Sequence, residues 1–373
     1  MNFSRRHFLA AGLALPAASL AQAPAPSALS YQKLGRTGLT PTRVAFGCMI
    51  TSDASVVEKA ADLGINYFDT ARGYQGGNNE RMVGAALKAR RKQVYISSKS
   101  HARDKAEAMT NLETSLRTLG TDYLDIWYLH GASSAGDLTP DLLEAQQAAK
   151  KDGKIRFTGV STHSGQASVI DGAIQCGKID VVLLAYNFTM DPAIEAALEK
   201  AKNAGIGLVA MKVMAGGFRR VNPDNKFYST LKRDGAMAAA LRWVLKNPRI
   251  DTTIPSMTDM DQLDENLKAM SAKFTEADQK ILSAYLRRIG PLYCRMCGKC
   301  EGTCSKGLPV ADVLRCLTYA DGYGQFALGR ERFLELPGKA ASVRCRECSS
   351  CSVHCPNGVR VAQRLSRAQE LFA

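Results

Sequence analysis

The sequence contains two runs of cysteines near its C-terminal end that could bind metal. Eight of the eleven cysteines belong to these runs, and both runs have the same spacings of three, three and four residues. The first consists of Cys294, Cys297, Cys300 and Cys304, and the second of Cys345, Cys348, Cys351 and Cys355. Thiolates spaced in this way are typical of ligands to [4Fe–4S] clusters.

The two runs predict a pair of clusters with crossed ligation. In ferredoxins with two clusters, the fourth cysteine of each run binds the cluster of the other run. We therefore expect Cys355 to complete the first cluster and Cys304 to complete the second. Zinc sites and disulfide bonds are the alternatives, but two identical ferredoxin spacings favour clusters. Ser305, rather than a proline, follows Cys304.

The N-terminal segment predicts export. Arg5 and Arg6 precede an apolar run over residues 8–20, and Ala21-Gln22-Ala23 offers a cleavage site. Paired arginines before Phe8 are typical of a signal read by the twin-arginine export machinery. We expect residues 1–23 to be this signal peptide, residues 24–30 a linker, and the mature protein to be periplasmic. An uncleaved membrane anchor is the alternative.

No stable membrane span is expected. The apolar run of the leader is shorter than the about 20 residues that a spanning helix needs, and Pro16 interrupts it.

The formal net charge of +14 falls to +12 without the two arginines of the leader, which contains no acidic residue. The basic residues are dispersed and no nucleic-acid-binding module is present, so a solvated surface is the favoured interpretation.

Alternating strand-like and helix-like segments fill the middle of the chain. Eight short apolar runs, among them "INYFDT", "QVYISSK" and "DIWYLH", are separated by amphipathic stretches. Eight strand–helix units predict a (β/α)8 TIM barrel over residues 31–271. Residues 31–43 would form a hairpin that covers its floor. Residues 272–289 would be a bridging helix, and residues 290–373 a small, mostly helical ferredoxin-like domain that holds the clusters.

Four polar residues lie at or just after the predicted ends of consecutive strands. They are Asp69, Tyr74, Lys99 and His130. The carboxyl ends of barrel strands carry the chemistry in such folds. Alone, each residue could be a helix cap, a solvated side chain or a core histidine. Together they predict an active site.

The segments around these residues resemble the aldo-keto reductase superfamily. "INYFDTARGYQGGNNERMVGAAL", "ISSKS" and "WYLHG" contain the residues that establish the resemblance. A barrel with a ferredoxin tail is similar to the iron–sulfur members of that superfamily. The resemblance implies carbonyl reduction with Tyr74 as proton donor, Lys99 and Asp69 tuning it, and His130 orienting the carbonyl. A free tyrosine has a pKa of about 10, and we expect the Lys99 ammonium to lower it.

The resemblance also suggests where a nicotinamide cofactor, NAD(P)(H), would bind. Ser161 and Thr162 stand where the family has a Ser–Asn pair that holds the carboxamide, and Lys212 follows the stacking position. Glu265 and Asn266 match residues that meet the adenine.

The residues expected to bind a 2′-phosphate are different. Ser256 and Gln262 stand where the family has a lysine and an arginine that hold this group in NADP. Without opposed charge a dianionic phosphate is bound weakly, so NAD, NADP and no tightly bound nucleotide all stay open.

The favoured hypothesis is an exported oxidoreductase that interconverts a carbonyl compound and an alcohol. Its clusters would exchange electrons with a redox partner protein. One alternative is a nicotinamide-dependent reductase with structural clusters. The other is a non-catalytic redox-sensing or electron-transfer module on a vestigial barrel.

Overall fold

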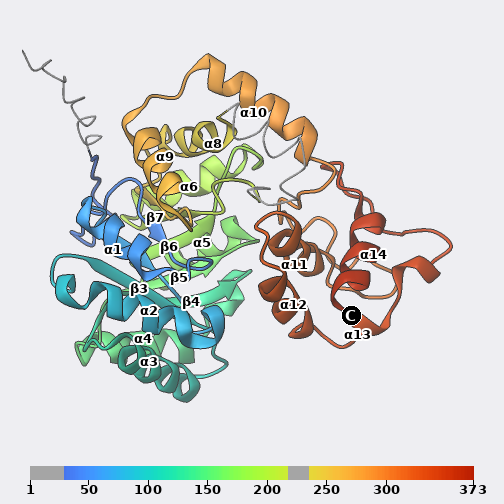
Figure 1. The fold of residues 1–373 in the computed structure, drawn as a ribbon. Coiled ribbons are helices and arrows are strands. Elements are labelled where there is room, and N and C mark those ends of the chain that lie inside the picture. Colours follow the sequence, from blue (N-terminus) through green and yellow to red (C-terminus); the bar gives the residue numbers. More distant parts are fainter. Residues whose placement is uncertain (1–28, 217–234) are drawn as a thin grey trace, which may run out of the picture.

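The computed structural model describes residues 29–216 and 235–373, so the predicted signal peptide lies outside the described residues. Eight parallel strands form one sheet in the order β1 to β8 (Figure 1). Their bounds are β1 Phe46–Gly47, β2 Tyr67–Asp69, β3 Tyr95–Ser100, β4 Leu124–Ala132, β5 Ile155–Thr162, β6 Val181–Ala185, β7 Gly207–Met211 and β8 Thr252–Thr253.

The sheet closes on itself between its first and last strands. Parallel bridges join Val44 to Thr253 and Gly47 to Ser256. The backbone N–H of Ala45 donates to the Thr253 carbonyl at 2.8 Å. This closure removes the sheet edges and confirms the predicted (β/α)8 barrel.

Helices surround the barrel, and several begin at side chains that cap them. Asp104 accepts a hydrogen bond from the backbone N–H of Glu107, and Thr139 accepts one from that of Leu142. Such caps satisfy backbone donors that the first turn leaves unpaired. The helices of the barrel are α1 Ala54–Asp62, α2 Asn78–Leu87, α3 Lys105–Leu119, α4 Pro140–Lys151, α5 Gln166–Cys176, α6 Ile194–Asn203, α8 Ala236–Leu245 and α9 Met260–Ser271.

Alternation along the strands separates two apolar cores. In β4, Ile126 and Tyr128 pack with the residues inside the barrel. Trp127 and Leu129 belong to the core between the sheet and the helices. The period of two therefore sends every second side chain of a strand toward the barrel axis. This rule also aims Asp69 and Lys99 inward.

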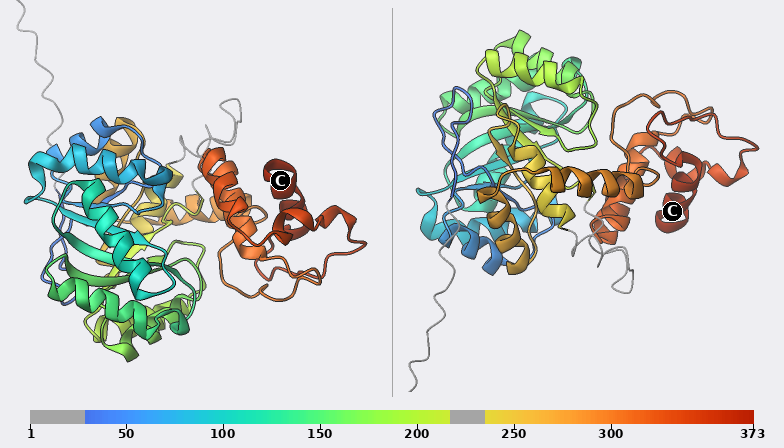
Figure 2. Two further views of the ribbon diagram at one scale, coloured as in Figure 1. Left: turned by 90° about the horizontal axis from the view of Figure 1, so that it is seen from below. Right: turned by 90° about the horizontal axis from the view of Figure 1, so that it is seen from above.

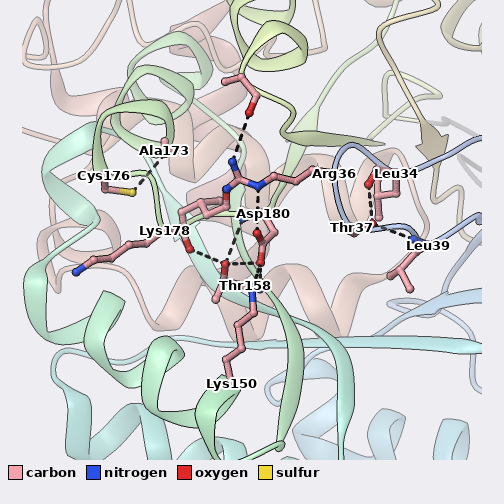
Figure 3. A network of polar contacts seen from close by, with 12 residues as sticks. Leu34, Arg36, Thr37, Leu39, Lys150, Thr158, Ala173, Cys176, Lys178 and Asp180 are labelled. Atoms are coloured by element: carbon pink, nitrogen blue, oxygen red, sulfur yellow. Dashed lines mark hydrogen bonds and ion pairs between the residues drawn. The ribbon is translucent and has the colours of Figure 1, made fainter.

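A network of ion pairs and hydrogen bonds closes the barrel floor (Figure 3). The segment over residues 31–43 folds back on itself through an antiparallel bridge between Tyr31 and Thr42. The Arg36 backbone N–H donates to the Gly205 carbonyl at 2.8 Å, and its guanidinium Nε lies 3.4 Å from Asp180. Lys150 Nζ lies 2.7 Å from the other Asp180 carboxylate oxygen. These contacts tie the N-terminal segment to the starts of the strands.

The C-terminal part forms a second, helical unit with its own apolar core. Its core contains Leu314, Leu317, Phe333, Leu365 and Phe372. The helices of this unit are α11 Val310–Asp321, α12 Phe326–Leu334, α13 Lys339–Ser342 and α14 Val361–Phe372. Helix α10, Glu276–Ile289, leads into the unit and packs on α8 of the barrel.

This unit lies beside one end of the barrel. Helices α11 and α12 stand between the barrel and α14 (Figure 1), and two further directions show the same arrangement (Figure 2). Within residues 29–216 and 235–373, no helix is both long and apolar enough to cross a membrane.

Candidate active site

Three of the four predicted catalytic residues lie on neighbouring strands. Asp69 ends β2, Lys99 lies in β3 and His130 in β4. Lys99 Nζ lies 2.5 Å from an Asp69 carboxylate oxygen and 2.7 Å from the Thr70 carbonyl. Both Asp69 and Lys99 are only 2% exposed. The ammonium therefore has a fixed position and an opposite charge beside it.

Tyr74 lies directly above this pair. Lys99 Nζ is 5.0 Å from the centroid of the Tyr74 ring. The ring of His130 meets the ring of Tyr74 edge-on, with 6.2 Å between their centroids. The structure thus brings the four predicted residues together, while their roles stay predictions.

The residues after Tyr74 hold its loop in place. Asn79, fully buried at the start of α2, accepts a hydrogen bond from Thr70 Oγ1 at 2.6 Å. Its amide nitrogen donates to the carbonyls of Cys48 at 2.8 Å and Thr51 at 3.0 Å. The Gln75 amide reaches the same Thr51 carbonyl at 2.9 Å. These buried hydrogen bonds account for Asn79, the second letter of "NNE" in the motif.

A buried glutamate fixes the same loop from below. Glu80 forms an ion pair with Arg72 and accepts a hydrogen bond from Ser98 Oγ at 2.6 Å. Arg72 also donates its backbone N–H to the Lys99 carbonyl at 2.9 Å. The position of Tyr74 is therefore linked through its own loop to the strand that carries Lys99.

A column of hydroxyl groups supports Asp69 inside the barrel. Ser97 Oγ donates to Asp69 at 2.7 Å and lies 3.0 Å from the Tyr67 hydroxyl. The Tyr67 hydroxyl lies 2.9 Å from that of Tyr128. Sequence reasoning missed this column, although the alternation of residues in β2, β3 and β4 points all of these side chains inward.

The expected acidification of Tyr74 by Lys99 is wrong. Burial raises the pKa of Tyr74 well above its usual value, and the negative charge of Asp69 raises it further. Lys99 is neutralised by Asp69 and is not among the groups that lower this pKa, whereas Arg332 of α12 is. The phenol therefore keeps its proton at neutral pH, as a proton donor must.

His130 is a neutral imidazole at physiological pH. Burial lowers its pKa well below the usual value, and the neighbouring His101, Lys99 and Arg332 act in the same direction. The His101 ring stacks on it with 4.2 Å between centroids. A neutral imidazole donates one hydrogen bond, which fits the predicted role of orienting a carbonyl oxygen.

A cavity of about 860 Å³, counting its open mouth, begins at Asp69 and Tyr74. At one end it reaches Ser256 and Gln262 of the segment around the start of α9. Its walls also include residues of the C-terminal unit, namely Gly322, Tyr323 and Gln325.

The C-terminal unit contacts the barrel directly above the site. Arg332 donates to the Gly73 carbonyl at 2.9 Å, one residue before Tyr74. A Cβ atom on Gly322 would overlap the carbonyl oxygen of Gly216. The second unit therefore forms part of the active-site wall, which the sequence did not predict.

Ser161 and Thr162 are buried and are not among the residues that line this cavity. Ser161 Oγ accepts the Gly131 N–H at 3.0 Å and lies 3.4 Å from the Leu129 carbonyl. These bonds hold the irregular end of β4 where the register with β5 shifts, and thereby support His130. Thr162 Oγ1 donates to the Ser164 carbonyl at 2.5 Å. Their predicted contact with a carboxamide stays a prediction.

Of the other predicted nucleotide contacts, one lines the cavity and two lie on α9. Lys212 lines it directly. Asn266, 1% exposed, has no hydrogen-bond partner for either polar side-chain atom among the described residues. A buried amide without partners is costly and fits a role in ligand binding. Glu265 lies beside it on α9 and has a partner of its own.

The cysteines of the first run gather with one cysteine of the second. Burial raises the pKa of Cys294 to about 12, and the neighbouring Cys300, Cys297 and Cys355 add to the rise. Asn357 Nδ2 lies 3.4 Å from the Cys297 sulfur.

The remaining four cysteines form the reciprocal set. Burial raises the pKa of Cys345 to about 11, and Cys304, Cys348 and Cys351 raise it further. Within residues 29–216 and 235–373, however, no group of three or more His, Cys, Asp or Glu side chains is arranged to hold a metal ion. The two clusters stay a prediction.

Several residues at the site were not singled out from the sequence. His163 follows β5, while Arg315 and Tyr319 belong to α11 and Tyr323 follows it. His101 directly follows β3, so the strand-end rule could have found it. No local signal places α11 over a barrel that lies far earlier in the chain.

Comparison with known proteins gives a consistent result. Residues 51–287 match the sequence model of the aldo/keto reductase family. The chain is 26% identical over 299 residues to the uncharacterized oxidoreductase YqkF of Bacillus subtilis, covering 69% of this chain and 96% of that protein. It is 27% identical over 296 residues to L-galactose dehydrogenase of Arabidopsis thaliana, covering 68% and 92%.

A solved structure shares the barrel. The aldo-keto reductase AKR11C1 from Bacillus halodurans in its holo form superposes with a TM-score of 0.60 at 26% identity. The match covers 69% of this chain and 96% of that one.

Proposed function

Since the chain belongs to the aldo/keto reductase family and is an oxidoreductase, we propose that it interconverts a carbonyl compound and an alcohol at Tyr74. The observation that carries this proposal is the position of Tyr74, which shares its cavity with Asp69 and lies 5.0 Å from the Lys99 ammonium. Family membership also favours an enzyme over the non-catalytic module.

Each residue has a distinct task in this proposal. Tyr74 donates its proton to the carbonyl oxygen as negative charge develops there. The neutral His130 donates a hydrogen bond to the same oxygen and sets its direction. Asp69 holds Lys99 through the 2.5 Å ion pair, and the pair fixes the ammonium 5.0 Å from the centre of the Tyr74 ring.

Replacement of Tyr74 tests the assignment. Tyr74→Phe removes the proton donor but keeps the ring, and we expect carbonyl reduction to fall by about 10²- to 10⁴-fold. Steady-state kinetics with an aldehyde and a reduced donor would measure this. Tyr95→Phe on β3 is the control, since Tyr95 packs near the barrel interior far below the cavity lining. Full turnover by Tyr74→Phe would remove the proposal.

A nicotinamide cofactor would supply the hydride. The residues that fit it are those lining the cavity from Tyr74 to Gln262, with the unpartnered Asn266 deeper on α9. Asp259 caps α9 and lies 2.5 Å from Gln262 Nε2. A carboxylate there disfavours a 2′-phosphate, which supports NAD over NADP.

We further propose that the cysteines hold two [4Fe–4S] clusters that pass single electrons to or from a redox partner protein. The mixed grouping of the two runs supports this, because it matches the crossed ligation of two-cluster ferredoxins. A [4Fe–4S] cluster is larger than a single metal ion. Its cysteine ligands therefore lie further apart than the ligands of a single ion.

Anaerobic titration with NADH and NADPH separates this version from the alternative with structural clusters. Nucleotide binding near micromolar, with no change in the visible spectrum, supports structural clusters. Cluster reduction by an artificial donor without nucleotide binding supports electron exchange.

Export by the twin-arginine route to the periplasm is part of the same proposal. It rests on the Arg5–Arg6 pair and the cleavage site at residues 21–23. Replacing both arginines by lysine should retain the protein in the cytoplasm with its leader attached. N-terminal sequencing of the fractionated protein measures this, and unchanged export would exclude the route.

A further inference from the structure

Lys212 is a cation in the active-site wall without a carboxylate partner. It follows β7 directly, at the carboxyl end of the strand. Its Nζ lies 4.9 Å from the Tyr319 ring centroid, 5.3 Å from that of Tyr323 and 3.9 Å from the Met49 sulfur. Among the described residues no ion pair neutralises it. Lys212 is partly exposed, but an ammonium with little water around it and no counterion is still costly.

The backbone at Lys212 is also strained. Its φ is +58°, in the left-handed region that non-glycine residues rarely adopt. Buried Asn187 stabilises this conformation by donating to the Lys212 carbonyl at 3.0 Å. The same amide nitrogen lies 3.2 Å from the Tyr293 hydroxyl. Strain that the surroundings maintain in this way is typical of functional sites.

Other cations surround Lys212, and their carboxylate partners are already used. Lys99 is paired with Asp69 at 2.5 Å. Arg315 is paired with Asp312 at 3.0 Å, on the partly exposed side of α11. The excess positive charge at the cavity is therefore that of Lys212.

This crowding of cations lowers the pKa values of neighbouring groups. Burial is the main reason that the pKa of His163 lies well below its usual value, and the charges of Lys212 and Arg315 lower it further. Burial, Arg315 and Lys99 together lower the pKa of Lys212 itself to about 7. The lowered pKa indicates that the rings of Tyr319 and Tyr323 do not stabilise the Lys212 ammonium as a carboxylate would.

A side pocket extends from Lys212 toward the C-terminal unit. It is lined by Lys212, Arg315, Thr318, Tyr319 and Tyr323, together with Tyr293, Cys294 and Met296. None of the cavity residues around the start of α9 takes part in it. An anion held here would contact Lys212 without contacting Ser256 or Gln262, the residues at the end of the cavity assigned to the nucleotide.

We propose that Lys212 and Arg315 bind the carboxylate or phosphate group of an anionic carbonyl substrate, whose reactive carbon lies at Tyr74. This inference rests on the proposed function, because it assigns the substrate class of the same site. The Tyr319 and Tyr323 rings exclude water from the ion pair, and the second unit thereby determines specificity as well as covering the barrel.

A pair of aldehydes that differ only in charge tests the proposal on the full-length protein. The probes are para-carboxybenzaldehyde and its neutral methyl ester. We expect kcat/KM to favour the acid, and Lys212→Met to lower the acid-to-ester ratio by about 30-fold. Lys212→Arg should keep most of the preference, because it retains the charge.

Lys246→Met is the matched control. Its ammonium also lies over two aromatic rings, 5.6 Å from Trp243 and 4.2 Å from Phe274, but outside the cavity. The control should leave the ratio unchanged. An equal ratio in wild type and Lys212→Met, with normal turnover, would refute the anion site and leave the proposed function intact.

A binding measurement without turnover separates the two proposals. By calorimetry, para-(hydroxymethyl)benzoate should bind the wild type and its methyl ester should not, with binding lost in Lys212→Met. This result without reduction of either aldehyde would support the anion site and refute the proposed function. If Lys212→Met instead weakens NADH binding and leaves the acid-to-ester ratio unchanged, the lysine binds nucleotide and the inference is wrong.

Discussion

Burial shifts the protonation of two cavity residues in directions that suit different tasks. Tyr74 is held as a phenol because burial and Asp69 raise its pKa. Lys212 titrates near neutrality because burial, Arg315 and Lys99 lower its pKa to about 7. Tyr74 is therefore protonated and can donate its proton. Lys212 gains a proton when an anion binds beside it.

The pH dependence of the two reaction directions should differ. Carbonyl reduction requires the protonated phenol, which dominates below the raised pKa of Tyr74. With the neutral ester, we expect reduction to be nearly constant from about pH 7 to 9. Alcohol oxidation requires the phenolate and should rise about tenfold per pH unit. A reduction rate that falls with a midpoint below pH 9 would show that Tyr74 is more acidic than its surroundings predict.

The anionic aldehyde should show an additional dependence. Only the protonated Lys212 attracts a carboxylate, so kcat/KM for the acid should fall as pH rises above about 7. The groups facing Lys212 are the cations Arg315 and Lys99, His163, and the neutral rings of Tyr319 and Tyr323. Comparison of acid and ester across pH isolates this effect, and Lys212→Arg should remove it because arginine stays charged.

At the scale of elements, the barrel is held at both ends by polar contacts between distant segments. At the floor, Asp180 receives hydrogen bonds from Lys150 and Thr158 as well as the Arg36 ion pair (Figure 3). Burial alone would raise the Asp180 pKa, but these contacts outweigh it and lower the pKa. The carboxylate therefore stabilises the fold in its ionised form.

Asp180→Asn should destabilise the protein by about 2 kcal/mol at pH 7, since it leaves Lys150 and Arg36 without their partner. The ionised Asp180 contributes stability above about pH 4, the range of an unfolded aspartate, and this contribution is lost as pH falls through its lower folded pKa. The difference between variant and wild type should therefore shrink in acid.

Thermal unfolding followed by circular dichroism measures the effect. Asp171→Asn is the control, because its 3.0 Å ion pair with Lys200 is exposed and such pairs contribute little. Equal melting temperatures for Asp180→Asn and wild type at pH 7 would contradict the role assigned to the floor network.

At the scale of the whole molecule, two units share one chemical site. The barrel supplies Asp69 and Tyr74, and the C-terminal unit supplies Gly322 and Tyr323 to the same cavity. The proposed crossed sets of cysteines would connect the first and last parts of that C-terminal unit. Iron, if bound as proposed, would hold together the unit that covers the site.

Paired cysteine variants test the crossed ligation. Cys294→Ala with Cys355→Ala removes two ligands of one proposed cluster, so iron should fall from about eight to about four atoms per chain. Cys294→Ala with Cys304→Ala removes one ligand from each proposed cluster and should leave little iron. Uncrossed ligation predicts the opposite results.

Iron analysis and paramagnetic-resonance spectra of anaerobically purified protein make this measurement. Cys176→Ala is the control, because Cys176 ends α5 on the barrel, outside both runs.

The sequence was sufficient for the barrel and for the grouping of Asp69, Tyr74, Lys99 and His130. Both follow from local periodicity and from the rule that parallel strands end on one face. It did not predict the raised Tyr74 pKa, which depends on burial beneath residues more than 200 positions away. The sequence also did not predict that Ser161 supports His130, because a serine hydroxyl can hydrogen-bond either a ligand or the backbone.

The contact between Gly322 and the Gly216 carbonyl has a consequence for what can enter. At this point the backbone of the C-terminal unit lies against the barrel, and a molecule bound at Tyr74 shares its cavity with residues of both units. We expect short compounds with a terminal carbonyl to be admitted, and the interior of a long polymer to be excluded by its width.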